Sequence, residues 1–370
     1  MMRPATRLPH TFSIRPVLSV LLLSGPSCDQ RSPDETDKVP SVPLPEAEVR
    51  YRTRYIDIAP LTDEPICAGT LAMMDAHVER MLGQLSLKLS RRIHMYLRQT
   101  DVGGSEEWCN IEHARGCYRS DVDAIVADLY AIPHELVHAI TVESGGSWWI
   151  EGIAYAFSGS PSTVIPDFAA GWYERRGWDG HLARWLVESY GGETYMELYE
   201  QTPSGSDQAA VEAAVREVLG QEFDAVLSEY AATSAYAYPD PWSCYRPPGE
   251  PESPWVGDFW EHEVAFDCDE ANTFSTAVAE RLRMTARVPI TIPREAPYRF
   301  IADHPDAELF LQPCPEEPLF ESTHEVQDWP IPMLFNVGAI TLKPGPYVLL
   351  VDLPAGSPVA VRLAGYLSVD

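Results

Sequence analysis

The chain has 370 residues, 45% of them hydrophobic and 10% aromatic, which is enough to bury the core of a globular protein of about two domains. Acidic residues outnumber basic residues by 55 to 27, and the formal net charge is −28 at pH 7. A field of this sign repels nucleic acid and anionic membrane surfaces, so the composition argues against both as partners.

The first 28 residues have the composition of an export signal. Three arginines precede a short apolar run, residues 17–23, and small residues then lead to Cys28. The run is too short to cross a bilayer as a helix, so the only membrane attachment we expect is a lipid anchor at this end. Cys28 resembles the lipid-attachment cysteine of bacterial lipoproteins; the alternative is that it is discarded with the cleaved signal. We expect residues 1–28 to direct export, with the protein lipid-anchored at the bacterial cell envelope or secreted.

The remaining six cysteines are an even set without a CxxC motif. This pattern favours disulfides over a zinc ribbon or a thioredoxin-like site, and disulfides accord with export. The sequence leaves the full pairing open. Cys109 and Cys117 are close enough along the chain to close a small loop together, and we predict that they are bonded.

Residues 29–48 are rich in proline, serine and acidic residues without apolar periodicity, which predicts a flexible linker. Apolar residues at strand or helix spacing begin after this linker. They predict a strand at 54–59, a helix at 68–87, a strand at 93–97, a helix opening within 122–140, and helices at 151–157, 181–190, 193–200 and 208–230. Leu219 and Gly220 interrupt the last of these helices.

Near residue 240 the composition changes. Residues 238–254 are dense in proline, and the short apolar runs beyond them are separated by proline and glycine. This punctuation predicts an antiparallel β-sandwich. We therefore expect an α+β protein, with one domain at 49–240 and a smaller all-β, sandwich-like domain at 241–370. The predicted strands of the second domain include 288–292, 298–301, 308–311 and 347–351.

Residues 134–138 read HELVH, an HExxH motif within a predicted helix. Positions four apart lie on one helical face, so the imidazoles of His134 and His138 can reach one metal ion. Glu135 projects beside them, where its carboxylate can accept a proton from a metal-bound water. Proline suits the first turn of a helix, so Pro133 predicts that this helix begins at about the residue before it.

Glu151 supplies a candidate third ligand, 13 positions after His138. The intervening stretch contains Gly145 and Gly146 and can turn the chain back, so that a second helix presents Glu151 from its first turn. Two histidines and a carboxylate leave one tetrahedral position for water. That is the arrangement of a catalytic zinc rather than a structural one.

HELVH followed by WWIEGIAY resembles the gluzincin metallopeptidases, and within them the bacterial peptidase-MA-like proteins. The resemblance covers about residues 50–232 and is specific at the two motifs. It implies a zincin-like fold for the first domain, one zinc ion on His134, His138 and Glu151, and a peptide or protein substrate. It also implies that Glu135 is the general base of peptide hydrolysis.

Two features depart from the family's pattern. The gap between His138 and Glu151 is shorter than in thermolysin, and Tyr155 stands four positions after Glu151 in place of an acidic residue. The sequence therefore does not identify the group that accepts a hydrogen bond from the second ring nitrogen of a histidine ligand. Tyr155 is a candidate donor to the oxyanion of the reaction, with core packing as its alternative role.

The sequence leaves other interpretations open. An inactive peptidase scaffold can serve as a surface-anchored binding protein, and the same three ligands can serve a zinc hydrolase that acts on another substrate. The simplest alternative is a helix face with two histidines and no metal. The C-terminal strands carry no catalytic motif; binding of substrate or cell surface is one role for them, and stabilisation of the first domain is another.

Overall fold

The computed structural model describes most of the chain from residue 42 onward. The described residues are 42–99, 105–109, 114–142, 147–158, 180–235, 238–239, 242, 244–249, 252–278, 281–314, 331–333, 339–356 and 359–367. The predicted export signal, Cys28 and the greater part of the predicted linker lie outside them. Within the described ranges, no helix is long and apolar enough to cross a membrane.

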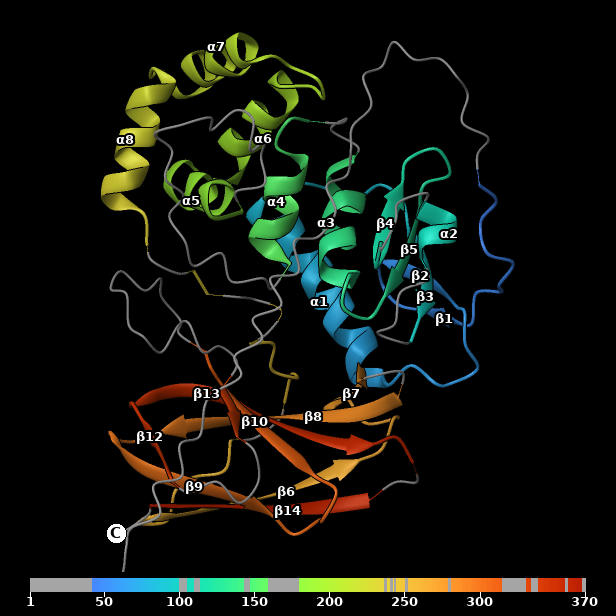
Figure 1. The fold of residues 1–370 in the computed structure, drawn as a ribbon, viewed down its shortest axis with the longest axis vertical. Coiled ribbons are helices and arrows are strands. Elements are labelled where there is room, and N and C mark those ends of the chain that lie inside the picture. The colour runs from blue at the N-terminus through green and yellow to red at the C-terminus, as the bar shows by residue number, and fades with distance from the viewer. Residues whose placement is uncertain are drawn as a thin grey trace, which may run out of the picture.

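A five-stranded sheet forms one side of the N-terminal part (Figure 1). Its order is β1-β2-β3-β5-β4, with the three central strands parallel and β1 and β4 antiparallel at the two edges. Every residue of β2 and of β5 is buried, as expected of central strands in a covered parallel sheet. The strands are β1 (Tyr51–Arg52), β2 (Ile56–Pro60), β3 (Ile93–Arg98), β4 (Gly116–Arg119) and β5 (Ala124–Asp128).

Helices α1, α3 and α4 lie between this sheet and a second group of helices, α5 to α8 (Figure 1). The central helix α3 contacts β4, β5, α1 and α4, and α4 in turn contacts α5. The first hydrophobic core fills the space between these elements. The helices are α1 (Ala68–Gln84), α2 (Glu106–Cys109), α3 (Ile132–Thr141), α4 (Ile150–Phe157), α5 (Gly180–Tyr190), α6 (Gly192–Gln201), α7 (Gln208–Leu219) and α8 (Phe223–Thr233).

The largest difference from the sequence prediction lies at 122–140. The helix α3 begins at Ile132, as Pro133 predicted, but the first part of this stretch forms strand β5, which the sequence pattern did not predict. The apolar run at 124–127 is short and contains β-branched residues, and periodicity does not separate a buried strand from a helix in such a run. The break predicted in the helix at 208–230 is confirmed: Gly220 adopts a left-handed conformation (φ 70°) that ends α7.

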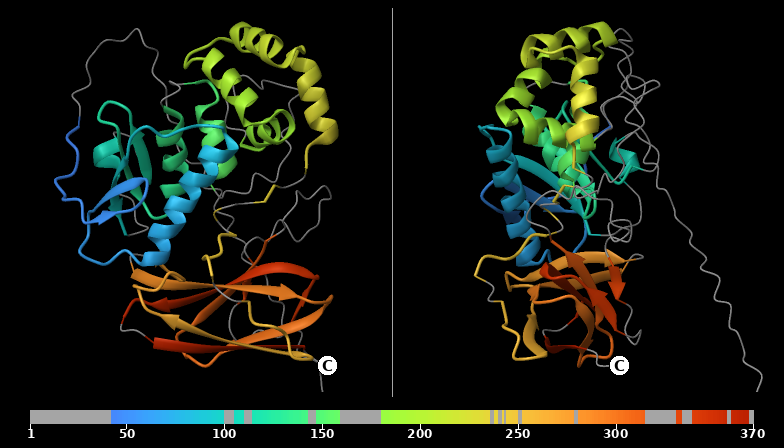
Figure 2. Two further views of the ribbon diagram at one scale, coloured as in Figure 1. Left: turned by 180° about the vertical axis from the view of Figure 1, so that it is seen from behind. Right: turned by 90° about the vertical axis from the view of Figure 1, so that its left-hand side faces the viewer.

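The C-terminal part forms two antiparallel sheets that face each other (Figure 2). One has the order β11-β10-β13-β8-β7 and the other the order β12-β9-β14-β6. Alternate residues of their strands fill a second core between the sheets. The strands are β6 (Phe259–Phe266), β7 (Thr273–Val278), β8 (Arg281–Ile292), β9 (Ala296–Ala302), β10 (Glu308–Pro313), β11 (Ile331–Met333), β12 (Ile340–Leu342), β13 (Gly345–Pro354) and β14 (Val359–Leu367).

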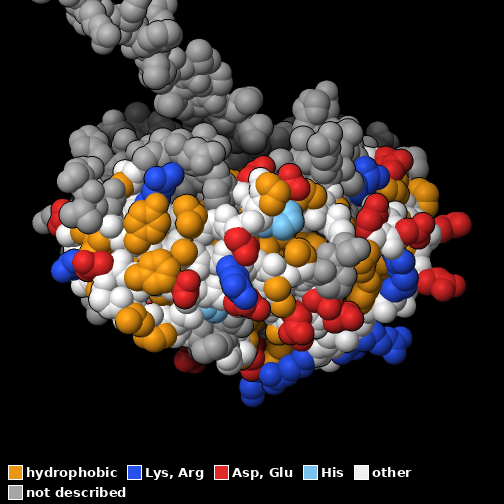
Figure 3. All heavy atoms as spheres, turned by 90° about the horizontal axis from the view of Figure 1, so that it is seen from below, with side chains coloured by type: hydrophobic (Ala, Val, Ile, Leu, Met, Phe, Trp, Pro, Cys, Tyr) orange, Lys and Arg blue, Asp and Glu red, His pale blue; other side chains and the backbone are white. Residues whose placement is uncertain are grey.

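We refer to these two sheets as the sandwich. All four runs that the sequence predicted as strands lie within β8, β9, β10 and β13. Figure 3 shows the end of the molecule that the sandwich forms, where acidic and basic side chains are scattered among hydrophobic ones. The described residues thus form an α+β protein of eight helices and three sheets, as the sequence predicted at the level of fold class.

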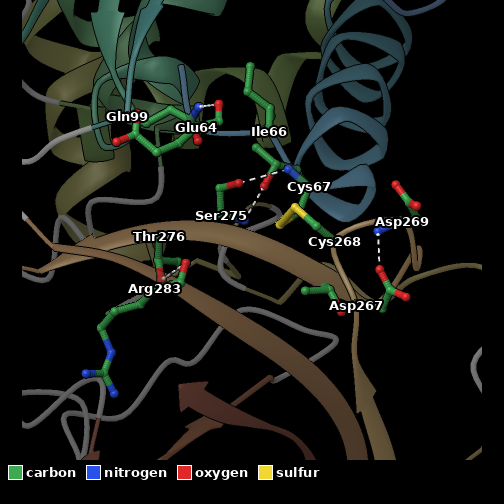
Figure 4. Close-up of a disulfide and its surroundings, with 12 residues drawn as sticks. Glu64, Ile66, Cys67, Gln99, Asp267, Cys268, Asp269, Ser275, Thr276 and Arg283 are labelled. Atoms are coloured by element: carbon green, nitrogen blue, oxygen red, sulfur yellow. Dashed lines mark hydrogen bonds between the residues drawn. A yellow bond between two sulfur atoms is a disulfide. The ribbon is translucent and has the colours of Figure 1, made fainter. Parts of the chain in front are cut away.

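The start of α1 is joined to the sandwich (Figure 4). Cys67, directly before α1, is disulfide-bonded to Cys268, and its amide donates a hydrogen bond of 2.9 Å to Oγ of Ser275. A Cβ on Gly69 would lie 2.5 Å from the carbonyl oxygen of Thr273, so only glycine allows this approach. The two cores therefore meet at a joint that is both covalent and closely packed.

Three disulfides pair all of the cysteines beyond Cys28. The predicted bond between Cys109 and Cys117 is present, and it joins α2 to β4. Three disulfides indicate a protein that folds in an oxidising compartment, as exported proteins do. The pairs are Cys67–Cys268, Cys109–Cys117 and Cys244–Cys314.

Candidate metal site

Helix α3 begins at a turn that Asp128 organises. The carboxylate of Asp128 accepts hydrogen bonds from the amides of Tyr130 (2.8 Å) and Ala131 (3.0 Å). Ala131 is the N-cap of α3 and its side chain cannot cap the helix, so Asp128 supplies part of what the helix start lacks. Pro133 stands in the first turn, as the sequence predicted.

His134 and His138 lie one turn apart on α3 and point to the same place. Their Nε2 atoms are 3.0 Å apart, and their ring centroids are 4.7 Å apart. His138 is buried and His134 is nearly so. The apolar residues of α3, including Leu136, Val137 and Ile140, turn into the first core and hold the helix in place.

Glu151 completes the group from the first turn of α4. Its Oε2 lies 3.3 Å from Nε2 of His134, and its Oε1 lies 3.5 Å from Nε2 of His138. One potential ligand atom from each of the three residues lies within 4.8 Å of the others. The structure therefore brings together the three residues that the sequence singled out as metal ligands.

The chain enters α4 through contacts with the end of α6. Oγ of Ser147 donates to the carbonyl oxygen of Thr202 (3.0 Å), and the amide of Trp148 donates to the same oxygen (2.8 Å). The amide of Trp149 then donates to Oγ of Ser147 (3.2 Å). These bonds orient the first turn of α4, and with it Glu151. The glycines predicted to turn the chain, at 145–146, lie outside the described residues.

The pKa values of the two histidines shift in opposite directions. Burial lowers the pKa of His138 to about 4, and the neighbouring His134 adds to the shift, so His138 is neutral at physiological pH. Burial also lowers the pKa of His134, but the carboxylates of Glu151 and Glu135 outweigh burial and the net shift is upward. Neutral imidazole is the form that binds a metal, so His138 is held in its ligand form.

Glu135 lies on the side of α3 that faces the edge strand β4. Burial raises the pKa of Glu135 to about 7; the charge of His134 opposes this shift, as does a hydrogen bond from the backbone of Tyr118. The carboxyl is therefore near its ionisation point at neutral pH. A Cβ on Gly116 of β4 would lie 3.0 Å from Cγ of Glu135, so the strand approaches the side chain as closely as glycine allows.

Tyr155 stands one turn beyond Glu151 on α4. Its ring centroid is 4.7 Å from that of His134, with the ring planes inclined at 63°. The side chain is half-buried, and its ring lies directly against a candidate metal ligand. Trp148 and Trp149 are buried in the first core, which fits a packing role for both.

Two further residues near the site carry no recognisable sequence signal. Tyr199 of α6 is fully buried, and burial raises its pKa to about 12, with the negative charge of Glu151 adding to the shift. His77 of α1 is also buried, and its Nε2 lies 3.2 Å from the carbonyl oxygen of Pro133. Neither belongs to a motif, because each reaches the site only through the packing of distant helices.

His181, the first residue of the helix predicted at 181–190, is fully buried at the start of α5. Its Nδ1 lies 2.7 Å from the hydroxyl of Tyr230, and its Nε2 lies 2.8 Å from the carbonyl oxygen of Ala235. Both ring nitrogens thus bridge α5 to α8 and the segment after it. His181 has a structural role.

Comparison with known proteins adds no assignment. No protein-family model matches the chain, and no curated protein matches it. The interpretation of the site therefore depends on the two sequence motifs and on the geometry of His134, His138 and Glu151.

Proposed function

We propose that this protein is an exported zinc-dependent peptidase, with His134, His138 and Glu151 as ligands of one zinc ion. The positions of their ligand atoms carry this proposal: the two Nε2 atoms are 3.0 Å apart, Oε2 of Glu151 lies 3.3 Å from that of His134, and Oε1 of Glu151 lies 3.5 Å from that of His138. Four ligands at about 2.0–2.1 Å from a tetrahedral zinc lie about 3.3 Å from one another. Two imidazole nitrogens and a carboxylate group at distances close to this value form a donor set suited to zinc, which would leave a fourth position for water.

Zinc bound at these ligands supplies a Lewis acid that activates water and polarises the scissile carbonyl. Glu135 acts as the general base: its carboxylate accepts a proton from the attacking water and delivers it to the leaving amine. Its buried position makes this transfer efficient, because a base with a pKa near the working pH combines the correct protonation state with sufficient basicity. The positive charge of a bound zinc ion beside Glu135 would favour the ionised carboxylate, which is the form that accepts the proton.

The expected substrate is a peptide or a protein. The α+β part at 49–240 serves as a zincin-like catalytic domain, and Tyr155 is the proposed donor to the oxyanion because its ring lies beside a ligand. With a lipid on Cys28 the enzyme acts at the cell envelope; without it the enzyme is secreted. The three disulfides support a location outside the cytoplasm.

One observation favours the alternative of an inactive, surface-anchored binding protein. A histidine that binds zinc normally donates its other ring N–H to an acceptor, which orients the ring. Nδ1 of His138 is buried and has no hydrogen-bond partner among the described residues. A scaffold that has lost turnover tolerates such a gap more easily than an active enzyme does.

Zinc content tests the proposal. The chain without its predicted signal, residues 29–370, is produced in an oxidising compartment beside a Glu151→Gln variant, and zinc is measured in both by atomic absorption. We expect about one zinc per chain in the wild type and a clear loss in the variant. A folded wild type that takes up no zinc, even after incubation with the metal, rules out the peptidase and leaves the binding protein.

A further inference from the structure

His77 connects α1 to the helix that carries both histidines of the candidate metal site. It is 4% exposed, and its Nε2 lies 3.2 Å from the carbonyl oxygen of Pro133, the residue before His134. Burial lowers the pKa of His77 to about 4, so the ring is neutral at physiological pH. Because the carbonyl can only accept, Nε2 carries the proton and donates it to Pro133.

Trp242 holds the other side of this imidazole. It lies in the segment between α8 and β6, and its ring meets that of His77 edge to face, with centroids 5.2 Å apart and planes at 90°. The carbonyl oxygen of Trp242 accepts a hydrogen bond of 2.9 Å from Nη1 of Arg287, a residue of β8. The Arg287 guanidinium lies 4.9 Å above the buried ring of Phe274 in the neighbouring strand. A continuous series of contacts therefore runs from the sandwich to the first turn of α3.

Disulfides bind to the sandwich both of the segments that meet at His77, namely α1 and the segment that contains Trp242. Cys67–Cys268 fixes the start of α1, the helix that carries His77, to the sandwich (Figure 4). Two residues beyond Trp242, Cys244 is bonded to Cys314 directly after β10. Both of the segments that meet at His77 are thus tied covalently to the sandwich.

The start of α3 needs such support. Its N-cap, Ala131, has no side chain that can bond the free amides of the first turn, and the helix is only 10 residues long. Two metal ligands on so short a helix depend on how the helix is placed against its neighbours. A shift of its first turn moves His134 relative to Glu151 on α4, and zinc affinity is sensitive to such displacements.

We propose that the sandwich is a fixed part of the support of the metal site, and that His77 is the positioning residue through which Trp242 and Arg287 set the start of α3. This inference rests on the proposed metal site for its functional meaning. It gives the C-terminal part a definite role: the sandwich determines the geometry of the ligands and is not an independent appendage.

A matched pair of substitutions tests the role of His77. Gln is expected to preserve the bond to Pro133, because its amide nitrogen lies about as far from the backbone as Nε2 of histidine, whereas Leu removes the bond. In residues 29–370 we expect His77→Leu to weaken zinc binding about tenfold in a chelator competition, and His77→Gln to weaken it by about threefold at most. Amide hydrogen exchange in α3 of the zinc-free protein should accelerate in the Leu variant more than in the Gln variant.

Arg287→Met tests the contribution of the sandwich, far from the metal. Met retains packing over Phe274 but cannot donate to the carbonyl of Trp242. We expect zinc binding weakened about threefold and faster exchange in α3. Arg294→Met is the control, since Arg294 is a sandwich arginine whose ion pair with Asp258 is exposed and contributes little. It should change neither quantity.

The outcomes separate this inference from the proposed function. If His77→Leu and Arg287→Met fold and keep wild-type zinc affinity and exchange in α3, the inference is overturned even though zinc binds. If the wild type binds no zinc but exchange in α3 responds to Arg287→Met and not to Arg294→Met, the metal proposal fails and the positioning role stands. Should His77→Leu fail to fold, His77→Gln and Arg287→Met still decide the question.

Discussion

The backbone of Gly116 in strand β4 passes directly against Glu135, so that a Cβ at position 116 would lie 3.0 Å from Cγ of the glutamate. The same Cβ would lie 2.7 Å from Cβ of Ala131. Both neighbours belong to the beginning of α3, where the backbone cannot easily move. The edge strand and the candidate base are therefore packed as a unit.

Gly116→Ala should consequently disturb both folding and activity. We expect a loss of stability of about 1–3 kcal/mol from overpacking, and reduced peptide hydrolysis because Glu135 is displaced. Thermal unfolding and a hydrolysis assay measure the two effects. Gly83→Ala is the matched control: nothing lies within 4 Å of its added Cβ, and alanine is expected to stabilise this position of α1 by about 0.5–1 kcal/mol. Equal behaviour of the two variants contradicts the packing described here.

Glu135→Gln separates metal binding from catalysis. The amide is close in size to the carboxyl but cannot accept the proton, so kcat should fall by about 10²–10⁴-fold while zinc content remains at the wild-type level. Zinc analysis and steady-state kinetics on a peptide panel make the measurement. Activity that survives this substitution removes Glu135 from the mechanism. If the wild type itself hydrolyses no peptide of the panel, the result supports the alternative of an inactive binding protein.

Tyr155→Phe tests the proposed oxyanion donor. Phe keeps the ring against His134 and removes only the hydroxyl. We expect kcat to fall about 10²-fold with KM and zinc affinity nearly unchanged, because the bond is made mainly in the transition state. A variant with wild-type kcat assigns Tyr155 to packing alone.

His77 makes the zinc-free protein sensitive to acid. Its pKa is about 4 in the folded state and about 6.5 when unfolded, so below pH 6.5 the unfolded chain binds a proton that the folded chain does not. The contribution of His77 to the free energy of unfolding is therefore fully present above pH 6.5, and it is lost as the pH falls towards 4. Between pH 7.5 and pH 5 the loss is about 2 kcal/mol. Urea unfolding at the two pH values should show a correspondingly smaller loss in His77→Gln than in the wild type, and an equal loss excludes His77 as the cause.

The long-range disulfide should stabilise the fold more than the short one. Cys67 and Cys268 are 201 positions apart, whereas Cys109 and Cys117 are 8 apart. Restriction of the unfolded chain predicts a loss of about 5 kcal/mol when the first pair is replaced by alanine, and of about 2–3 kcal/mol for the second. Chemical denaturation of the two double variants checks the order. A reversed order shows that packing around the sulfurs dominates over the entropy of the unfolded chain.

The sequence predicted the elements whose residues carry their own pattern. The amphipathic spacing of α1 and the proline of α3 located these helices, and HExxH with Glu151 located the candidate ligands, because a motif keeps its residues close along the chain. The strand β5 was missed because a short, fully apolar run has no periodicity to read. The predicted zincin-like fold remains a proposal, since the strand order alone does not distinguish it.

The surroundings of the site were beyond the sequence. Tyr199 and His77 reach α3 and α4 from helices that lie more than 30 residues away on either side, and only tertiary packing brings them near. The bond between Cys67 and Cys268 was equally hidden, since an even number of cysteines fixes no pairing. Local patterns identify the groups that carry out chemistry; the groups that position them emerge only when the cores are packed.

The bond between Cys67 and Cys268 also turns the chain between them into a covalent ring that contains His134, His138 and Glu151. A single cut by a protease anywhere in that ring opens a loop without releasing a fragment. For a protein exposed outside the cytoplasm, the ligands thus stay on one connected molecule after a first nick. Two cuts are required before any part of the candidate metal site can be lost.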